Sequence, residues 1–271
     1  MNSEITEAVV ADDLTLTYAS RRADTAGPAI SGVSLRISAG EILAVIGDSG
    51  SGKSTLAAAF AGMTGIPGAG GARITGGSLT VLGQSMRHIS TRRRQSLLLK
   101  VGYVPQDGGS RLLPHLTVAE NVAQPIFSRD RRFSTDEAGE AVATAIDTVR
   151  LPLGVLGRYP HELSRGQRQR VAIATALILE PALLIADDPA SGIDVSARGP
   201  ILDIIREAQQ RRPFSAMIVS HALSDVRRFS DRVAVMQRGV LVGLGPLDEL
   251  LADPHHPYLR ELASTAHSAA R

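Results

Sequence analysis

Residues 47–55 read Gly-Asp-Ser-Gly-Ser-Gly-Lys-Ser-Thr and directly follow an almost unbroken apolar run at residues 41–46. The run has the length and composition of a strand that is buried on both faces of a sheet. The residues from Lys53 to Gly62 have helical character. A glycine-rich loop between such a strand and a helix lets backbone N–H groups turn inward around an anion. This feature therefore predicts an α/β fold with a parallel sheet.

The loop matches the pattern G-x-x-x-x-G-K-[ST], which predicts a site for the phosphates of a nucleotide. Lys53 is one of only two lysines among 29 basic residues, and it would place its charge on the β and γ phosphates. The Ser54 hydroxyl would coordinate Mg²⁺. A Gly- and Ser-rich surface turn is the alternative, but strand and helix context disfavours it. The residues that we predict to bind the nucleotide are Gly47, Ser49, Gly50, Ser51, Gly52, Lys53, Ser54 and Thr55.

A second buried strand is predicted at residues 182–186, and two acids, Asp187 and Asp188, follow it. An aspartate that caps the end of a core strand is the simpler interpretation of this pattern. Beside a phosphate-binding loop, a carboxylate in this place is expected to hold Mg²⁺. We therefore predict that Asp187 holds Mg²⁺ through water and that Asp188 polarises an attacking water molecule.

The hydrophobic periodicity predicts an early β-rich portion and then alternating strands and helices. Residues 66–77 are glycine-rich and are expected to form a loop or turn, with a short strand at 78–82 and a basic helix at 86–99. Residues 106–163 are mostly helical in pattern and interrupt the alternation, so they predict a helical subdomain inserted into the parallel sheet. The last residues are expected to be a frayed tail.

Composition excludes several classes of protein. The chain has no cysteine, which excludes disulfides and thiolate metal sites. It has no tryptophan and 3% aromatic residues, and its formal net charge is +2. A nucleic-acid partner is therefore not expected. The apolar runs are too short to span a bilayer, and the first residues lack the layout of a signal peptide, which predicts a cytoplasmic protein.

Further elements occur in a fixed order around the phosphate-binding loop. Tyr18 precedes it, Gln106 ends a strand, and residues 163–170 read Leu-Ser-Arg-Gly-Gln-Arg-Gln-Arg. Residues 188–194 read Asp-Pro-Ala-Ser-Gly-Ile-Asp, and His221 ends another strand. In this combination the chain resembles the ATP-binding-cassette (ABC) family from residue 9 to about residue 251.

The resemblance implies a role for each of these positions. Tyr18 would stack on the adenine of ATP, although a strand tyrosine can also face a core. Gln106 would contact Mg²⁺ or water and sense a membrane partner. Ser164, Gly166 and Gln167 would bind the γ-phosphate of an ATP held by the opposite subunit. His221 would donate a hydrogen bond to the γ-phosphate. The expected catalytic residues are Asp188, His221 and Gln106, and the expected Mg²⁺ ligands are Ser54, Gln106 and Asp187.

The resemblance also implies a domain organisation. Residues 1–271 would form a single ABC ATPase domain: a P-loop NTPase parallel-sheet core, an N-terminal antiparallel β subdomain and an inserted helical subdomain. The nucleotide-binding core would comprise about residues 8–105 and 180–250. The helical subdomain and signature helix would comprise about 106–179, and 252–271 would be a tail.

Three segments resemble the peptide/nickel importer branch in particular. They are the phosphate loop with Asp48, the pairs Gln106-Asp107 and Leu113-Pro114, and the tail sequence Pro-His-His-Pro-Tyr-Leu at 254–259. That branch implies a second, head-to-tail ABC ATPase subunit, two transmembrane permease subunits and an extracytoplasmic solute-binding protein. The chain would lie at the cytoplasmic face of the inner membrane. The alternatives are an exporter ATPase, a weakly hydrolysing regulatory subunit, or a soluble member that acts on DNA or ribosomes. The last usually has a long coiled-coil insertion or two cassettes, which 271 residues do not fit.

Two positions depart from the family pattern. Asp188 stands where the family has glutamate, so its carboxylate falls roughly 1.5 Å short and predicts slow hydrolysis at this chain's own loop. Arg165 stands where the signature has glycine, and it is expected to face the ATP that the partner binds.

Overall fold

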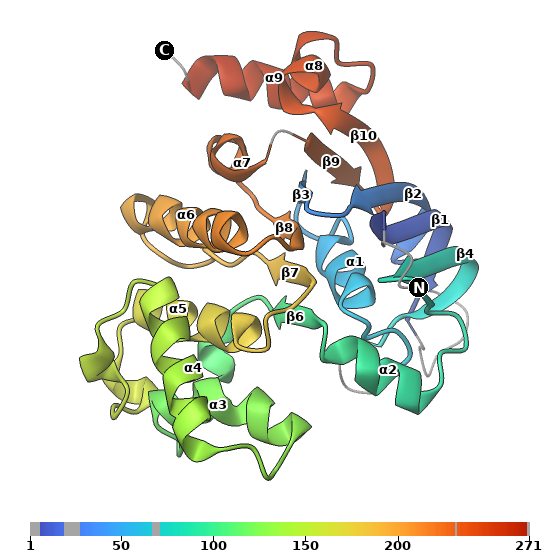
Figure 1. The fold of residues 1–271 in the computed structure, drawn as a ribbon. Coiled ribbons are helices and arrows are strands. Elements are labelled where there is room, and N and C mark those ends of the chain that lie inside the picture. The colour runs from blue at the N-terminus through green and yellow to red at the C-terminus, as the bar shows by residue number, and fades with distance from the viewer. Residues whose placement is uncertain (1–5, 19–27, 67–70, 231, 270–271) are drawn as a thin grey trace.

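The computed structural model describes residues 6–18, 28–66, 71–230 and 232–269 of the chain. In this part of the chain the strands form two sheets, one of four strands and one of six. A helical subdomain forms the end of the molecule opposite the C-terminal helices α8 (Leu247–Ala252) and α9 (Pro257–Ala269) (Figure 1). The described residues therefore have the predicted α/β architecture.

The four-stranded sheet is antiparallel and has the order β2-β1-β4-β5. Its strands are β1 (Glu7–Thr17), β2 (Ile30–Ser38), β4 (Arg73–Val81) and β5 (Gln84–Ser85). The prediction of a loop at 66–77 is wrong from Arg73 onward, because Ile74 and Gly76 pair with Leu16 and Thr15 of β1. A Cβ on Gly76 would lie 3.1 Å from the Thr15 side chain, so here glycine admits a close neighbour.

The six-stranded sheet has the order β10-β9-β3-β8-β7-β6. Five neighbouring strands are parallel, and β10 is antiparallel to β9. The strands are β3 (Ile42–Gly47), β6 (Val101–Val104), β7 (Leu183–Asp187), β8 (Ser215–Val219), β9 (Arg232–Gln237) and β10 (Val240–Pro246). The carboxyl ends of β3, β6, β7 and β8 therefore meet at one edge, where the residues predicted for the site follow each strand.

The two faces of this sheet belong to two hydrophobic cores. In β3, Leu43 and Val45 face a core shared with α1 (Lys53–Phe60) and the antiparallel sheet. Ala44 and Ile46 face the other core, which includes residues of the helical subdomain. Alternation along a strand produces this division, because successive side chains point to opposite faces.

The helical subdomain follows β6 and returns to the sheet at β7. It comprises η1 (Gly108–Arg111), α3 (Val118–Arg129), α4 (Thr135–Thr148), η2 (Leu153–Val155), η3 (Pro160–Glu162) and the signature helix α5 (Arg165–Leu177). Ser134 caps α4 by accepting a hydrogen bond from the Glu137 N–H. The basic helix, by contrast, is shorter than expected: α2 spans Thr91–Leu98 after its N-cap, Ser90.

The remaining helices complete the second core. They are α6 (Val195–Arg211), α7 (Leu223–Phe229), α8 (Leu247–Ala252) and α9 (Pro257–Ala269). The prediction of a frayed tail is wrong for α9, which packs against β10. His256 Nδ1 accepts a hydrogen bond from the Tyr258 N–H at 3.2 Å and so caps the helix. In the described ranges no helix is both long enough and apolar enough to cross a membrane.

Candidate nucleotide site

The phosphate loop runs from the end of β3 to the start of α1, and Lys53 is its central side chain. Lys53 is 5% exposed, and its Nζ donates to the carbonyl oxygens of Gly47 and Asp48 at 2.8 and 2.6 Å. Burial lowers the pKa of Lys53, whereas the charges of Asp187, Asp48 and Asp188 favour its protonated form. The N-terminus of α1 adds N–H groups and a partial positive charge. The loop therefore offers a cation and converging N–H donors to an anion.

Asp187 lies at the end of β7, 3% exposed, and its Oδ1 accepts a hydrogen bond from Ser54 Oγ at 3.1 Å. Burial raises the pKa of the Asp187 carboxyl, and the Ser54 hydrogen bond and the Lys53 charge oppose this rise. A hydroxyl and a carboxylate side by side fit Mg²⁺, which binds proteins through one or two such oxygens together with the phosphates of a substrate. Ser54 and Asp187 thus form a pair that could hold Mg²⁺.

Asp188 directly follows β7, and its Oδ2 lies 3.5 Å from His221 Nε2 at the end of β8. Its φ of 49° lies in the left-handed region, which aspartate tolerates better than most residues. Burial raises the pKa of the Asp188 carboxyl, and His221 and a hydrogen bond from Ser191 oppose the rise. The predicted acid and the predicted histidine are therefore neighbours.

A cavity of about 290 Å³ opens over the phosphate loop. The described residues that line it include Tyr18, Gln106 and His221, which come from three different parts of the chain. Tyr18 is 47% exposed and does not face a core, and its hydroxyl lies 2.7 Å from Thr55 Oγ1. The cavity lining also includes Ala29, Ser49, Gly50, Gly52, Lys53, Ser54 and Thr55. Neither Asp187 nor Asp188 belongs to this described lining.

The three signature residues predicted to bind a phosphate do not line this cavity among the described residues. Ser164 is the N-cap of α5: its Oγ accepts from the Gln167 N–H at 3.2 Å, and Gln167 Oε1 accepts from the Ser164 N–H at 2.9 Å. A Cβ added to Gly166 would meet no atom of the described chain within 4 Å. Arg165 pairs with Asp107 of its own chain at 2.8 Å, and its contact with a partner's ATP stays a prediction.

Sequence reasoning missed two tyrosines at this end of the molecule. Burial raises the pKa of Tyr103 to about 12, and Asp187 adds to the rise. Tyr258 of α9 is 7% exposed, and its hydroxyl faces the Asp48 carboxylate of the phosphate loop, which together with burial raises the pKa of Tyr258. The tail sequence and the acid at position 48 were both noticed in the sequence, but their contact is visible only in the fold.

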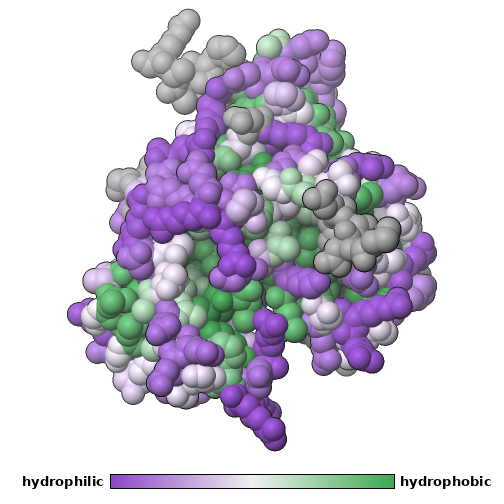
Figure 2. Space-filling model, in the orientation of Figure 1, coloured by the Kyte–Doolittle hydropathy of each residue, from purple (hydrophilic) through white to green (hydrophobic). Residues whose placement is uncertain are grey.

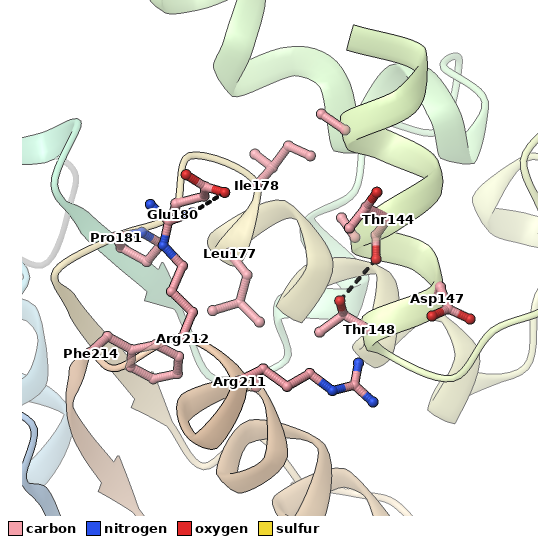
Figure 3. A pocket seen from close by; sticks show the side chains of 13 residues that line it. Thr144, Asp147, Thr148, Leu177, Ile178, Glu180, Pro181, Arg211, Arg212 and Phe214 are labelled. Carbon is pink, nitrogen blue, oxygen red and sulfur yellow. Dashed lines mark hydrogen bonds and ion pairs between the residues drawn. The ribbon is translucent and has the colours of Figure 1, made fainter. Parts of the chain in front are cut away.

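A second cavity, of about 400 Å³, lies at the opposite edge of the sheet, between α4 and the ends of α5 and α6 (Figure 3). Leu177, Ile178, Pro181 and Phe214 provide apolar lining, and Arg212 forms an ion pair with Glu180 at its rim. Hydrophobic surface also shows in the hollow between the helical subdomain and the sheet, bordered by hydrophilic residues (Figure 2). The first cavity, unlike the second, is lined by the phosphate loop with Lys53 and by Gln106 and His221, so it is the candidate reaction site.

The sequence and fold of this chain are similar to those of known nucleotide-binding proteins. Residues 30–191 match the family model described as ABC transporter. The chain therefore belongs to the ABC transporter family, and its fold is that of an ATP-binding cassette. A dimeric structure of the cassette MJ0796 bound to ADP and Pi superposes with a TM-score of 0.77 at 25% identity, covering 88% of this chain and 98% of that one.

Within the family, the chain is similar to ATP-binding proteins of peptide transport. The oligopeptide transport ATP-binding protein OppF of Escherichia coli is 37% identical over 87% of this chain and 68% of its own length. The di/tripeptide transport ATP-binding protein DppF of Pseudomonas aeruginosa is 37% identical over 87% of this chain and 70% of its own length. The predicted resemblance to the peptide branch is thus confirmed.

Proposed function

We propose that this chain binds and hydrolyses ATP as the nucleotide-binding subunit of a peptide-importing ABC transporter. The observation that carries the proposal is the cavity over the phosphate loop, where Lys53, Gln106 and His221 converge from separate segments. The similarity to OppF and DppF, whose names specify peptide transport, supports the substrate class. Transport across the inner membrane would place the chain at its cytoplasmic face, against two permease subunits, with a solute-binding protein on the opposite side of the membrane.

The residues divide the work of phosphoryl transfer between them. Lys53 and the N–H groups of the loop bind the β and γ phosphates, and Tyr18 lies where an aromatic ring can stack on the base. Ser54 and Asp187, joined by Gln106, would hold Mg²⁺, which supplies charge neutralisation on the phosphates when bound. Asp188 orients the attacking water, and His221 donates to the γ-phosphate. Positioning and charge provide most of the catalysis in such reactions.

Asp187 and Asp188 bring two negative charges close to a phosphate, and the fold compensates for them. The positive charge of Lys53 favours the ionised form of both carboxyls. The Asp188 carboxylate also accepts a hydrogen bond from Ser191, which limits the directions in which it can point. A carboxylate held in this way can orient water without moving toward the phosphate.

A second subunit would complete the site from outside the chain. Glycine at position 166 lowers the stability of a helix by up to about 1 kcal/mol relative to alanine, yet no described atom of its own chain needs the space. The open space beside Gly166 would allow a nucleotide bound to another subunit to approach the start of α5 closely. The cassette structures that this chain resembles are dimeric, which supports a pair of subunits, and we propose that the pair is head-to-tail.

The test is the binding and hydrolysis of Mg·ATP by the full chain. Wild type should bind Mg·ATP in calorimetry, and Lys53→Ala should lose tight binding because the phosphates lose their main cation. Lys100→Ala is the matched control, since Lys100 is the other lysine and lies on the surface between α2 and β6. Wild-type affinity in Lys53→Ala would overturn the assignment of the loop.

A regulatory, weakly hydrolysing subunit is a second candidate function, and Asp188 favours it. The Asp188 side chain is shorter than the family's glutamate and is absent from the described cavity lining. Phosphate release measured on the chain alone and with its transporter partners separates the two functions. Tight binding with negligible turnover in both settings would favour the regulatory subunit.

A further inference from the structure

Arg165 is the first residue of α5, and its guanidinium contacts two loops of the candidate site in its own chain. Arg165 Nη2 donates to Asp107 Oδ1 at 2.8 Å, and both side chains are about half exposed, at 53% and 51%. Asp107 directly follows Gln106. The first contact therefore connects the start of the signature helix to the loop that carries Gln106.

The second contact is with Gly192. A Cβ added to Gly192 would lie 1.9 Å from Arg165 Nη2 and 2.0 Å from Cζ, so the guanidinium packs directly on this glycine. The φ of Gly192 is +64°, which also favours glycine. Ser191, its neighbour, donates its N–H to the Asp188 carbonyl oxygen at 3.0 Å and hydrogen-bonds to the Asp188 carboxylate. Arg165 thus also connects α5 to the loop that carries Asp188.

The Gln106 loop is already joined to α5 one turn farther along. The Gly109 N–H of η1 donates to Gln169 Oε1 at 3.0 Å, and Gln169 is 4% exposed. This buried hydrogen bond fixes η1 against α5. Among the described contacts, no buried hydrogen bond joins α5 to residues 188–192. The Arg165 side chain therefore provides the connection that glycine, the family residue at this position, cannot make.

We propose that Arg165 is a positioning residue that couples nucleotide binding at this chain's own phosphate loop to the N-terminus of α5. The proposal rests on the proposed function, because Gln106 and Asp188 respond to the nucleotide and Ser164 and Gly166 face the partner. A planar guanidinium suits the task, since it can donate to a carboxylate while it packs flat on a backbone. An exposed ion pair contributes little to stability, so it can break and reform without loss of the fold.

The experiment compares full-length wild type with Arg165→Ala, Arg165→Lys, Asp107→Asn and the double variant Arg165→Ala/Asp107→Asn. Arg129→Ala is the control, because Arg129 is an exposed arginine of α3. Steady-state phosphate release gives kcat and KM. Hydrogen exchange with and without Mg·ATP gives the change in protection of residues 163–170.

The expected result is a kcat about tenfold lower in Arg165→Ala with KM unchanged, because a misplacement of about 1 Å costs up to about 100-fold in rate. The ATP-dependent change in protection at 163–170 should disappear in the same variant. Arg165→Lys should recover part of kcat, and the double variant should be no worse than Arg165→Ala. Arg129→Ala should behave as wild type.

Three results would overturn the inference: a wild-type kcat and protection change in Arg165→Ala, an effect on KM alone, or additive losses in the double variant. Asp107→Asn keeps the test valid if Arg165→Ala folds poorly, because asparagine matches aspartate in shape and tolerates the φ of 54° at that position. Wild type that neither binds nor hydrolyses ATP would instead contradict the proposed function.

Discussion

Replacing Asp188 with glutamate extends the side chain by one methylene, about 1.5 Å. Asp188 Oδ2 already lies 3.5 Å from His221 Nε2, so a straight extension would bring the two groups too close. The longer side chain must therefore bend past the His221 ring, which itself lines the cavity over the phosphate loop. We expect the glutamate oxygens to enter that cavity, where we propose that the attacking water is oriented.

The gain in turnover follows from this change in reach. A misplacement of about 1 Å costs about 100-fold in rate, so Asp188→Glu should raise kcat by about tenfold or more. The backbone opposes the change, because φ at this position is 49° and glutamate adopts the left-handed region less readily than aspartate. The free energy of unfolding should therefore fall by about 1 kcal/mol. Turnover and stability should move in opposite directions.

The assay is phosphate release at saturating Mg·ATP, with affinity from calorimetry and stability from urea unfolding. Asp188→Asn is the matched control: it keeps the size of the side chain and tolerates the backbone, but it cannot act as a carboxylate, so turnover should fall below wild type. Turnover of Asp188→Glu at or below wild type, with equal ATP affinity, would refute the argument that reach limits this site.

Three further outcomes are expected. Burial raises the pKa of Asp187, and only its ionised form can hold Mg²⁺. As the pH is lowered, the Mg²⁺-dependent affinity for ATP, measured by calorimetry, should therefore be lost at a higher pH than for an ordinary aspartate. A loss of affinity at the pH of an ordinary aspartate would contradict this. Gly166→Leu should leave the unfolding midpoint near wild type, since no described atom lies within 4 Å of the added Cβ, yet abolish ATP-dependent association in light scattering; retained association contradicts a partner-facing α5. Tyr258→Phe should lower the free energy of unfolding by about 1 kcal/mol and weaken ATP binding, because the hydroxyl that faces Asp48 is lost; unchanged affinity would show that α9 does not support the loop.

The sequence predicts the centre of the site well because its chemistry is local. The phosphate loop, the acids after β7 and the histidine after β8 each follow a short buried strand, and parallel strands bring their carboxyl ends to one edge. Knowledge of strand ends is therefore enough to place Lys53, Asp187 and His221 together. The helix at 134–149 was equally predictable, because its capping residue Ser134 acts three residues along the chain.

The wrong predictions concern segments whose structure depends on contacts with residues far away in the sequence. The glycines at 76 and 77 disfavour a strand locally, but pairing with β1 imposes one. The prediction of a frayed tail is wrong because the apolar face of α9 is buried against β10 and the core, which only the fold shows. The contacts of Arg165 with Asp107 and Gly192 are likewise visible only in the fold. Contacts between residues that are far apart in the sequence override local preference at these positions.

The order of the six-stranded sheet has a consequence for the synthesis of the chain. Strand β3, which leads into the phosphate loop, pairs with β8 and β9, and its Leu43 lies opposite Met217 and Arg232. A ribosome that adds about 5–20 residues per second needs roughly ten seconds or more to reach those partners. During this time the nascent chain holds an unpaired strand with two apolar faces, which is prone to aggregation. A chain that stops before residue 237 lacks all or part of one neighbour of β3, so no N-terminal fragment should acquire the nucleotide site before nearly the whole chain has been made.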